Sequence, residues 1–442
     1  MSQAVARETS IVARRTQPAA KDAITRAQRP RPAATAAQGR QFVSLRDAAP
    51  GSYHLVWITT LLLLVAGMCM VLSVSVAGAV EGGDKFGLLR TQSIAAAVGI
   101  ALLMLLWRAD YRKLRIASMA FLGVVGFLLV LVHIPPFGRT AGGASSYLRL
   151  GPFTLQPSEF AKLALVLAGA HLLSMRRAQT GAFGAYVWPF GAIGLGMCAL
   201  VTLEGDLGTA IIIGGLLLGM LWIAGMKARH WILLAGSSLG MALAVAFSSP
   251  VRMSRIFSFL NPSADPQGSS YQLWQSLVAL GRGGWFGVGP GESIQKFQYL
   301  PKAHTDMIFS ILGEEYGLLG AFAVIMLFGA FAVACWRLAR RCAEPMARYL
   351  IAGCGMLVTL QAVVNIGGVI GALPLTGVPL PFISYGRSSL VVMLMAVGLI
   401  LAVARRAPAR SAVPAAVRYS NVTHIDRRRW DGGPRSARSC PR

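Results

Sequence analysis

Residues 299–317 read Tyr299-Leu-Pro-Lys-Ala-His-Thr-Asp-Met-Ile-Phe-Ser-Ile-Leu-Gly-Glu-Glu-Tyr-Gly317, a polar and ionisable stretch that leads into a long apolar run. A carboxylate where an extramembrane loop becomes an apolar helix is costly unless it is paired or used. Asp306 is therefore our candidate reacting group. An aspartate at a helix start can also satisfy free backbone N–H groups, so helix capping by Asp306 is the alternative interpretation.

Apolar runs of similar length recur along the rest of the chain. The 442 residues are 55% hydrophobic, with a mean hydropathy of +0.58. Runs of about 20 apolar residues cross a bilayer as helices, so the sequence predicts an all-α polytopic membrane protein. Ten transmembrane helices are expected, near residues 54–79, 89–107, 116–134, 159–175, 183–203, 207–226, 231–248, 306–336, 349–372 and 386–404.

The net charge of +25 is concentrated in the tails and in short loops. Most Lys and Arg residues lie in the two tails or in the loops after the second, fourth, sixth and eighth helices, so the positive-inside rule places that face and both termini in the cytoplasm. Residues 1–50 and 406–442 are predicted to be disordered basic tails around a membrane domain, 51–405. No nucleic-acid partner is expected, and the six cysteines suggest neither a disulfide framework nor a metal site.

The only long loop, roughly 249–305, is predicted to lie outside the cytoplasm and to be functional. Within it, Leu273, Trp274, Leu277 and Leu280 share one side of a short amphipathic helix that would rest at the outer interface. The Gly-rich run 281–291 follows. Tight turns explain this run as well as a close approach of its backbone to a lipid diphosphate does.

Two further polar junctions interrupt the apolar pattern. Glu159 and Lys162 open the fourth helix, where they either cap it and form an internal ion pair or line a cavity that opens outward. The stretch 365–389 contains three prolines and a Ser-Tyr-Gly turn. Because broken backbone at bilayer depth needs protein or water partners, this stretch is expected to form the wall of a cavity.

These segments together resemble the SEDS family (shape, elongation, division and sporulation), the ten-helix peptidoglycan glycosyltransferases of the FtsW and RodA type. The resemblance covers about residues 54–405, and its details are closer to FtsW than to RodA. It rests on motifs in a fixed order: Gln156-Pro-Ser-Glu, Asp206-Leu-Gly-Thr-Ala, Asn261-Pro with Asp265 and Tyr271-Gln, Gly287-Val-Gly-Pro-Gly, Leu300-Pro-Lys-Ala-His-Thr-Asp306, Gly313-Glu-Glu and Pro379-Leu-Pro-Phe-Ile-Ser-Tyr-Gly.

The resemblance implies an enzyme that polymerises lipid II, the undecaprenyl-diphosphate-linked disaccharide peptide, at the outer face of the bacterial cytoplasmic membrane during cell division. It also implies a class B penicillin-binding protein and other division proteins as partners. Asp306 would be the general base, and a divalent cation, Mg or Mn, could assist. Substrate contacts are expected from Arg149, Glu159, Lys162, Arg282, Lys296, Lys302, His304, Thr305, Ser384 and Tyr385.

The chain departs from the family pattern at three positions, Ser146, Gly205 and Arg387. Arg387 stands where a glycine is usual, and it either extends to the outer interface or replaces the cation lost at Ser146 and binds the lipid diphosphate. Glu314 and Glu315 lie roughly 12–14 Å beyond Asp306 along a helix, too far to share its substrate hydroxyl. We expect them to have structural roles, with at least one bonded to neighbouring donors.

Two other classes of function remain open from the sequence. A transporter would flip the lipid-linked sugar, but transporters gather their ionisable groups near the bilayer midplane, whereas here they gather at outward helix ends. A non-catalytic scaffold that recruits division enzymes is the other alternative. Synthesis of glycan chains by the purified protein in detergent would separate the enzyme from both.

Overall fold

The computed structural model describes residues 43–410, except 80–85, 135–137, 142–143, 151–152, 176–183, 185–186, 248–249, 264, 269 and 298. All of these residues belong to one compact unit that begins at Val43. The helices within it are α3 (Leu45–Ala48), α4 (Pro50–Ala79), α5 (Gly87–Arg108), η2 (Tyr111–Lys113), α6 (Leu114–Leu131), α7 (Pro157–Met175), η4 (Val187–Gly191), α9 (Ala192–Leu203), α10 (Leu207–Ile223), α11 (Ala228–Phe247), α12 (Pro250–Leu260), α13 (Tyr271–Gly283), α14 (Ile308–Arg341), α15 (Pro345–Val369) and α16 (Arg387–Arg406).

The predicted helical architecture is confirmed. Each of the ten expected ranges overlaps an apolar helix, from α4 to α16. Among the described residues, seven helices are long and apolar enough to cross a membrane, and three shorter apolar helices cover 117–131, 188–203 and 207–223. The chain is therefore a multi-pass membrane protein.

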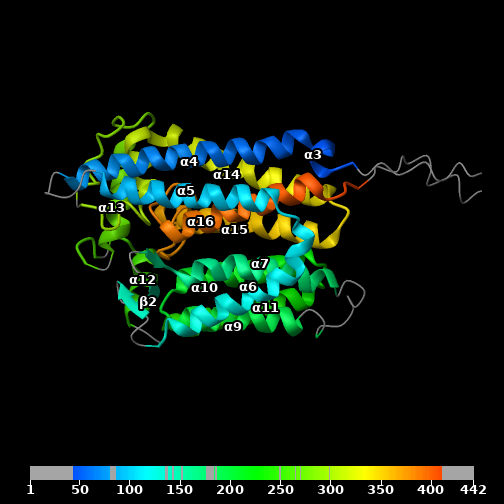
Figure 1. Ribbon diagram of the computed structural model, residues 1–442. Helices are drawn as coiled ribbons and strands as arrows, with labels where there is room; N and C mark the ends of the chain where they lie inside the picture. The colour runs from blue at the N-terminus through cyan, green and yellow to red at the C-terminus, as the bar shows by residue number, and fades with distance from the viewer. Residues whose placement is uncertain are drawn as a thin grey trace, which may run out of the picture. The chain divides into compact units, whose positions relative to one another are not determined.

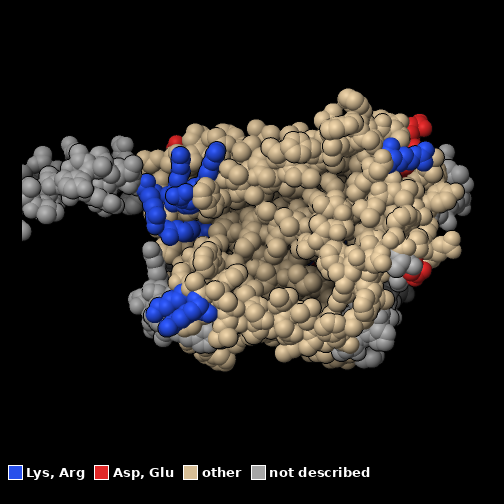
Figure 2. Space-filling view, turned by 180° about the vertical axis from the view of Figure 1, so that it is seen from behind, with Lys and Arg blue, Asp and Glu red and all other residues tan. Residues whose placement is uncertain are grey.

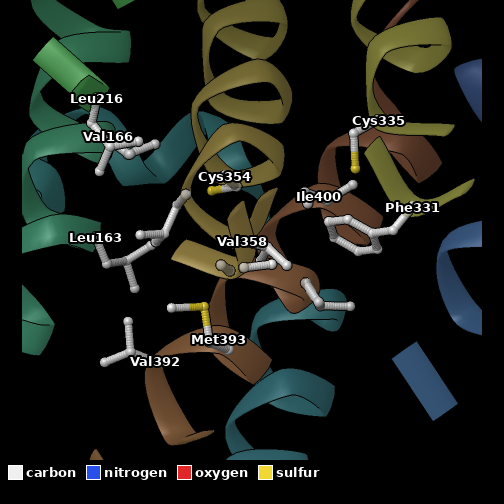
Figure 3. Close-up of a cluster of buried hydrophobic side chains, with 14 of the residues drawn as sticks. Leu163, Val166, Leu216, Phe331, Cys335, Cys354, Val358, Val392, Met393 and Ile400 are labelled. Atoms are coloured by element: carbon white, nitrogen blue, oxygen red, sulfur yellow. The ribbon is translucent and has the colours of Figure 1, made fainter. Parts of the chain in front are cut away.

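The long helices run side by side in two groups (Figure 1). One group contains α4, α5, α14, α15 and α16, and the other contains α6, α7, α9, α10 and α11. Helix α7 joins the groups because it packs against α15 as well as against α6 and α10. Figure 3 shows the apolar side chains that fill this junction, among them Leu163 of α7, Val358 of α15 and Met393 of α16, all of them fully buried.

Both ends of the described chain meet at one end of the bundle. The backbone N–H of Leu45 donates to the Ala407 carbonyl at 3.0 Å, and that of Ala409 donates to the Val43 carbonyl at 2.9 Å. Exposed Lys and Arg side chains gather at this end, as the space-filling view shows (Figure 2). Among the described residues, the seven long and three shorter apolar helices make an even number, and an even number of spans returns a chain to the side where it began. The cytoplasmic location of this end remains a prediction.

The opposite end carries structure that the sequence analysis did not predict. Three antiparallel strands, β1 (Gly138–Ala141), β2 (Ala144–Leu150) and β3 (Phe153–Leu155), form a small sheet in the order β1-β2-β3. The loop 249–305 also contains an additional helix, α12. Residues of α12 and α13 line one of the cavities described below, and residues of β2 and β3 line the other.

Helix α13 forms where expected, and Leu273 of its apolar side is buried, but two positions depart from the expected amphipathic pattern. Trp274, on the apolar side, is 36% exposed, whereas the polar Ser276 is fully buried. The Ser276 hydroxyl lies 2.7 Å from the Ser310 hydroxyl of α14 and donates to the Val369 carbonyl at 2.7 Å. Side-chain periodicity places polar groups toward water, but these hydrogen bonds hold the Ser276 hydroxyl in the interior.

The Gly-rich run packs against a break in α14. Gly317 has a φ of 67°, which interrupts the helix, and the N–H groups of Val288 and Gly289 donate to the Glu314 and Glu315 carbonyls. A Cβ atom on Gly287 would lie 2.1 Å from the Glu315 oxygen. Close approach of two backbones therefore explains a glycine at this position. Of the two interpretations left open, the structure supports turns and tight packing.

Candidate active site

Asp306 lies at the end of the bundle opposite α3, in the turn that leads into α14. The N-cap position of α14 belongs to Met307, and the Asp306 side chain borders two cavities instead. The residue is only 8% exposed. Its backbone is fixed from α15, because the Asn365 side-chain amide donates to the carbonyls of Asp306, at 2.9 Å, and Val378, at 2.8 Å.

The first cavity, about 350 Å³, lies against the start of α16, and we call it the α16 cavity. The second, about 200 Å³, lies against α12, and we call it the α12 cavity. Lys302, Asp306 and Gly377 line both. The carboxylate therefore stands on a wall that the two cavities share.

The α16 cavity is the charged one. Besides Lys302 and Asp306 it is lined by Glu159, Asp206 and Arg387. The Lys302 ammonium lies 3.8 Å from Asp306 Oδ2, and Arg387 Nη2 donates to Thr154 Oγ1 of β3 at 2.6 Å. Two cations and several carboxylates thus share one partly enclosed space.

Burial alters the titration of two neutral groups that line this cavity. Desolvation is the largest cause that raises the pKa of Tyr147, and the charges of Asp206, Glu159 and Asp306 raise it further. Desolvation also lowers the pKa of His304 below its ordinary value, so its ring is neutral at neutral pH. The His304 ring packs edge-on against Tyr385, with 5.7 Å between centroids.

Several predicted site residues do come together. Those that line the α16 cavity with Asp306 are Glu159, Lys302, His304, Thr305 and Tyr385. The broken segment after α15 forms part of the same wall, as predicted, through Gly377, Pro379, Tyr385 and Gly386. Arg387, the departure from the family pattern, lies beside them.

Lys162 lies behind the wall instead of on it. It is completely buried, and its ammonium contacts Glu159 Oε1 at 2.7 Å and Gln361 Oε1 at 2.6 Å. Gln361 Nε2 in turn donates to the Pro379 carbonyl and to Ser389 Oγ, both residues of the cavity lining. Both interpretations of the Glu159–Lys162 pair therefore hold in part, because the ion pair forms and Glu159 also faces the cavity.

Two of the residues expected to contact the substrate, Arg282 and Lys296, lie away from Asp306. Arg282 Nε lies 3.7 Å from Glu314, and Lys296 Nζ lies 3.0 Å from Glu315. The loop 281–297 folds back onto α14 and brings each cation to a buried carboxylate. Neither cation lines the α16 or the α12 cavity.

The two glutamates have the structural contacts that the sequence analysis expected. Glu314 accepts hydrogen bonds from Ser293 Oγ at 2.5 Å and from the Ile294 N–H at 3.1 Å. Glu315 accepts one from Ser73 Oγ of α4 at 2.6 Å. These bonds tie α4 and the loop to the break in α14.

Ser384 and Arg149 complete the set of predicted residues. Ser384 Oγ accepts from the Leu380 N–H at 2.8 Å, so it stabilises the turn before α16 and does not line either cavity. The backbone of Arg149 lies in β2, where it pairs with Thr154. The Arg149 side chain lies outside what the structure describes.

Several lining residues were not among the predicted site residues, and they include Tyr147, Thr154, Asp206 and Asn365. Asp206 caps α10 by accepting from the Thr209 N–H at 2.9 Å, and Gln156 Nε2 holds its other oxygen at 3.2 Å. Alternating polar and apolar residues between Gly-rich turns at 138–155 were the available signal for the sheet that carries Tyr147 and Thr154.

The donor set does not form a metal site by itself. Among the residues that the structure describes, no three His, Cys, Asp or Glu side chains lie close enough together to hold an ion. No step of the chemistry below is therefore assigned to a metal ion.

Comparison with known proteins identifies the family of the chain. A family model described as "Cell cycle protein", for FtsW, RodA and SpoVE, matches residues 53–408. The stage V sporulation protein E of Bacillus subtilis is 38% identical over 79% of this chain and 95% of its own length. A probable peptidoglycan glycosyltransferase FtsW of Thioalkalivibrio sulfidiphilus is 39% identical over 79% and 88%.

Solved structures agree with this. One from a study titled "Structural coordination of polymerization and crosslinking by a peptidoglycan synthase complex" has a TM-score of 0.65 at 29% identity, covering 80% of this chain and 97% of its own. The RodA rod-shape-determining protein of Thermus thermophilus has a TM-score of 0.58 at 28% identity, covering 79% and 95%. The chain belongs to the FtsW/RodA/SpoVE family of cell cycle proteins.

Proposed function

We propose that this chain is a peptidoglycan glycosyltransferase that polymerises lipid II into glycan strands, with Asp306 as general base. One observation carries the proposal: a nearly buried carboxylate stands on the wall shared by two cavities, with Lys302 beside it and Arg387 in the larger cavity. A transferase needs room for two sugars and a base between them. The position of Asp306 meets that need.

The reaction transfers a sugar from a lipid diphosphate to a hydroxyl. The attacking hydroxyl oxygen bonds to the anomeric carbon of the donor sugar while the bond from that carbon to the diphosphate oxygen breaks. The diphosphate leaves with the electron pair, and the Asp306 carboxylate takes the proton of the attacking hydroxyl. The products are a glycan lengthened by one unit and a free lipid diphosphate.

Cations of the α16 cavity stabilise the departing group. Arg387 and Lys302 both line this cavity, and charge-assisted hydrogen bonds from guanidinium and ammonium groups to phosphate oxygens are the strong ones. Neutral His304 adds no positive charge, but it can exchange hydrogen bonds with the substrate. This assigns to Arg387 the diphosphate role that the sequence left open.

The relatives support a role in division. Proteins named FtsW and stage V sporulation protein E are 38–39% identical to this chain, whereas the RodA structure is 28% identical. A related structure comes from a peptidoglycan synthase complex. We place the protein in the bacterial inner membrane at the division septum, with both termini in the cytoplasm, Asp306 at the outer face, and a class B penicillin-binding protein and other division proteins as partners.

The test is polymerisation in detergent. The purified full-length protein, together with its class B penicillin-binding partner, is incubated with labelled lipid II, and glycan chains are resolved by gel electrophoresis. Chains longer than the starting disaccharide support the enzyme, and detergent removes the second compartment that a transporter requires. Unchanged lipid II in the presence of the correctly folded complex would contradict the proposal.

A further inference from the structure

Asn365 of α15 carries a polar atom that the described structure leaves unused. Its side-chain nitrogen donates to the carbonyls of Asp306 and Val378, which uses both amide hydrogens and fixes the orientation of the group. Its oxygen, Oδ1, has no hydrogen-bond partner among the residues that the structure describes, although the residue is only 4% exposed. A buried acceptor without a donor costs free energy, so an unpaired one indicates a missing partner.

The unused oxygen belongs to a residue that lines the α12 cavity. Among the side chains that the structure describes, this cavity has charged ones only where Lys302 and Asp306 form the wall shared with the α16 cavity. Its other polar side chains are neutral, among them Ser254 and Ser258 of α12 and Gln272 of α13, and apolar surface comes from Phe259, Leu273 and Leu375. Neutral polar groups set among apolar ones suit a sugar, whose ring offers hydroxyls and an apolar face.

The two cavities therefore differ in the chemistry that they can bind. The α16 cavity holds Arg387, whose guanidinium suits a diphosphate, whereas the described lining of the α12 cavity beyond the shared wall is neutral. At about 200 Å³ the α12 cavity is also smaller than the ~300–1,000 Å³ of sites that enclose a complete ligand. It has room for part of a substrate, such as the reacting sugar, while the rest lies outside.

We infer that the α12 cavity is the subsite of the attacking sugar and that Asn365 Oδ1 accepts a hydrogen bond from one of its hydroxyls. The inference rests on the proposed function and adds which cavity binds the attacking sugar and which binds the diphosphate. The attacking hydroxyl then approaches Asp306 from the α12 side, and the diphosphate departs on the α16 side. The Asn365 side chain therefore has two roles, because its oxygen binds the substrate and its nitrogen holds the Asp306 backbone.

Two substrate analogues separate the subsites. Lipid II with its attacking hydroxyl methylated can donate but not accept, and lipid II with a non-cleavable phosphonate link can accept but not donate. The wild-type complex joins one of each, and the KM of each analogue is measured while the other is saturating. The resulting tetrasaccharide is quantified by mass spectrometry.

Asn365→Leu should raise the KM of the acceptor analogue about 3- to 10-fold, the size expected for one lost neutral hydrogen bond, and leave the KM of the donor analogue unchanged. The matched control is Gln361→Leu, one helical turn away on α15. Gln361 also holds the broken segment, through the Pro379 carbonyl, but its oxygen is already paired with Lys162 and it lines neither cavity. The control should lower thermal stability without changing the ratio of the two KM values.

Ser258→Leu tests the cavity without touching Asn365. Ser258 Oγ bonds within α12, to the Ser254 carbonyl, so leucine there fills the α12 cavity and leaves the contacts of α15 intact. This variant should also raise the KM of the acceptor analogue alone, and it decides the matter if Asn365→Leu does not fold. Equal changes in both KM values, or a change confined to the donor, would overturn the inference. Failure of the wild type to form tetrasaccharide would instead overturn the proposed function, and the inference with it.

Discussion

The buried pair of Glu159 and Lys162 offers a sharp test of how the wall of the α16 cavity is held. Lys162→Met removes the ammonium and leaves Glu159, 1% exposed, as a buried carboxylate whose other oxygen, Oε2, has no hydrogen-bond partner among the described residues. Removing one partner of a buried pair costs about 3–5 kcal/mol, because the remaining charge stays desolvated. The free energy of unfolding should fall by that amount in SDS titrations of the protein in mixed micelles.

Neutralising the second charge should restore part of the loss. The double variant Glu159→Gln/Lys162→Met has no buried charge at this point, so it should be more stable than Lys162→Met alone by at least ~1 kcal/mol. Arg282→Met is the matched control, because Arg282 is 42% exposed and Glu314 keeps its hydrogen bonds to Ser293 and Ile294. That change should cost no more than ~1 kcal/mol. A Lys162→Met cost as small as the control, with no recovery in the double variant, would refute the reasoning.

Three other outcomes follow from local geometry. Gly287→Ala should destabilise the protein by more than ~1 kcal/mol, because φ is 85° there and the new Cβ would meet the Glu315 carbonyl. Gly281→Ala is the control and should not destabilise the protein, because Gly281 has open space around it. Thermal melting measures the stability of both variants. Folding lowers the pKa of His304, so the unfolded chain binds more protons than the folded chain at pH values between that pKa and about 6.5. The free energy of unfolding should therefore fall on acidification through this window, and it should fall less in His304→Gln. An impermeant thiol reagent should label Ser263→Cys but not Arg229→Cys in intact cells, in a background without other accessible cysteines; the reverse pattern would contradict the orientation.

The helices could be predicted from the sequence because one strong signal governs them. An apolar run of bilayer length has few alternatives to a spanning helix, and the range 207–226, for example, corresponds to α10 at Leu207–Ile223. The elements outside the bundle carry weaker signals. Helix α12 has only 11 residues and the strands of the sheet have three to seven, so local pattern alone did not identify them.

Part of the candidate site could likewise be predicted from the sequence, and part could not. Asp306, His304 and Lys302 are adjacent in sequence, so their proximity in the structure follows from the motif. Arg282 and Lys296 lie just before that motif, yet the loop folds back onto α14 and pairs them with Glu314 and Glu315. Long-range pairing of this kind leaves no mark in a single sequence. Asn365 was overlooked because an amide in an apolar helix indicates helix packing until its neighbours are known.

In the proposed reaction, the Asp306 carboxylate takes the proton of the attacking hydroxyl. Asp306→Asn keeps the size of the side chain and removes the base, and Asp110→Asn, at the opposite end of the bundle, is the control. The rate of lipid II polymerisation by the purified complex should fall ~10²–10⁴-fold for Asp306→Asn, with normal folding and partner binding, and stay unchanged for the control. Near-normal polymerisation by a folded Asp306→Asn complex would contradict the account.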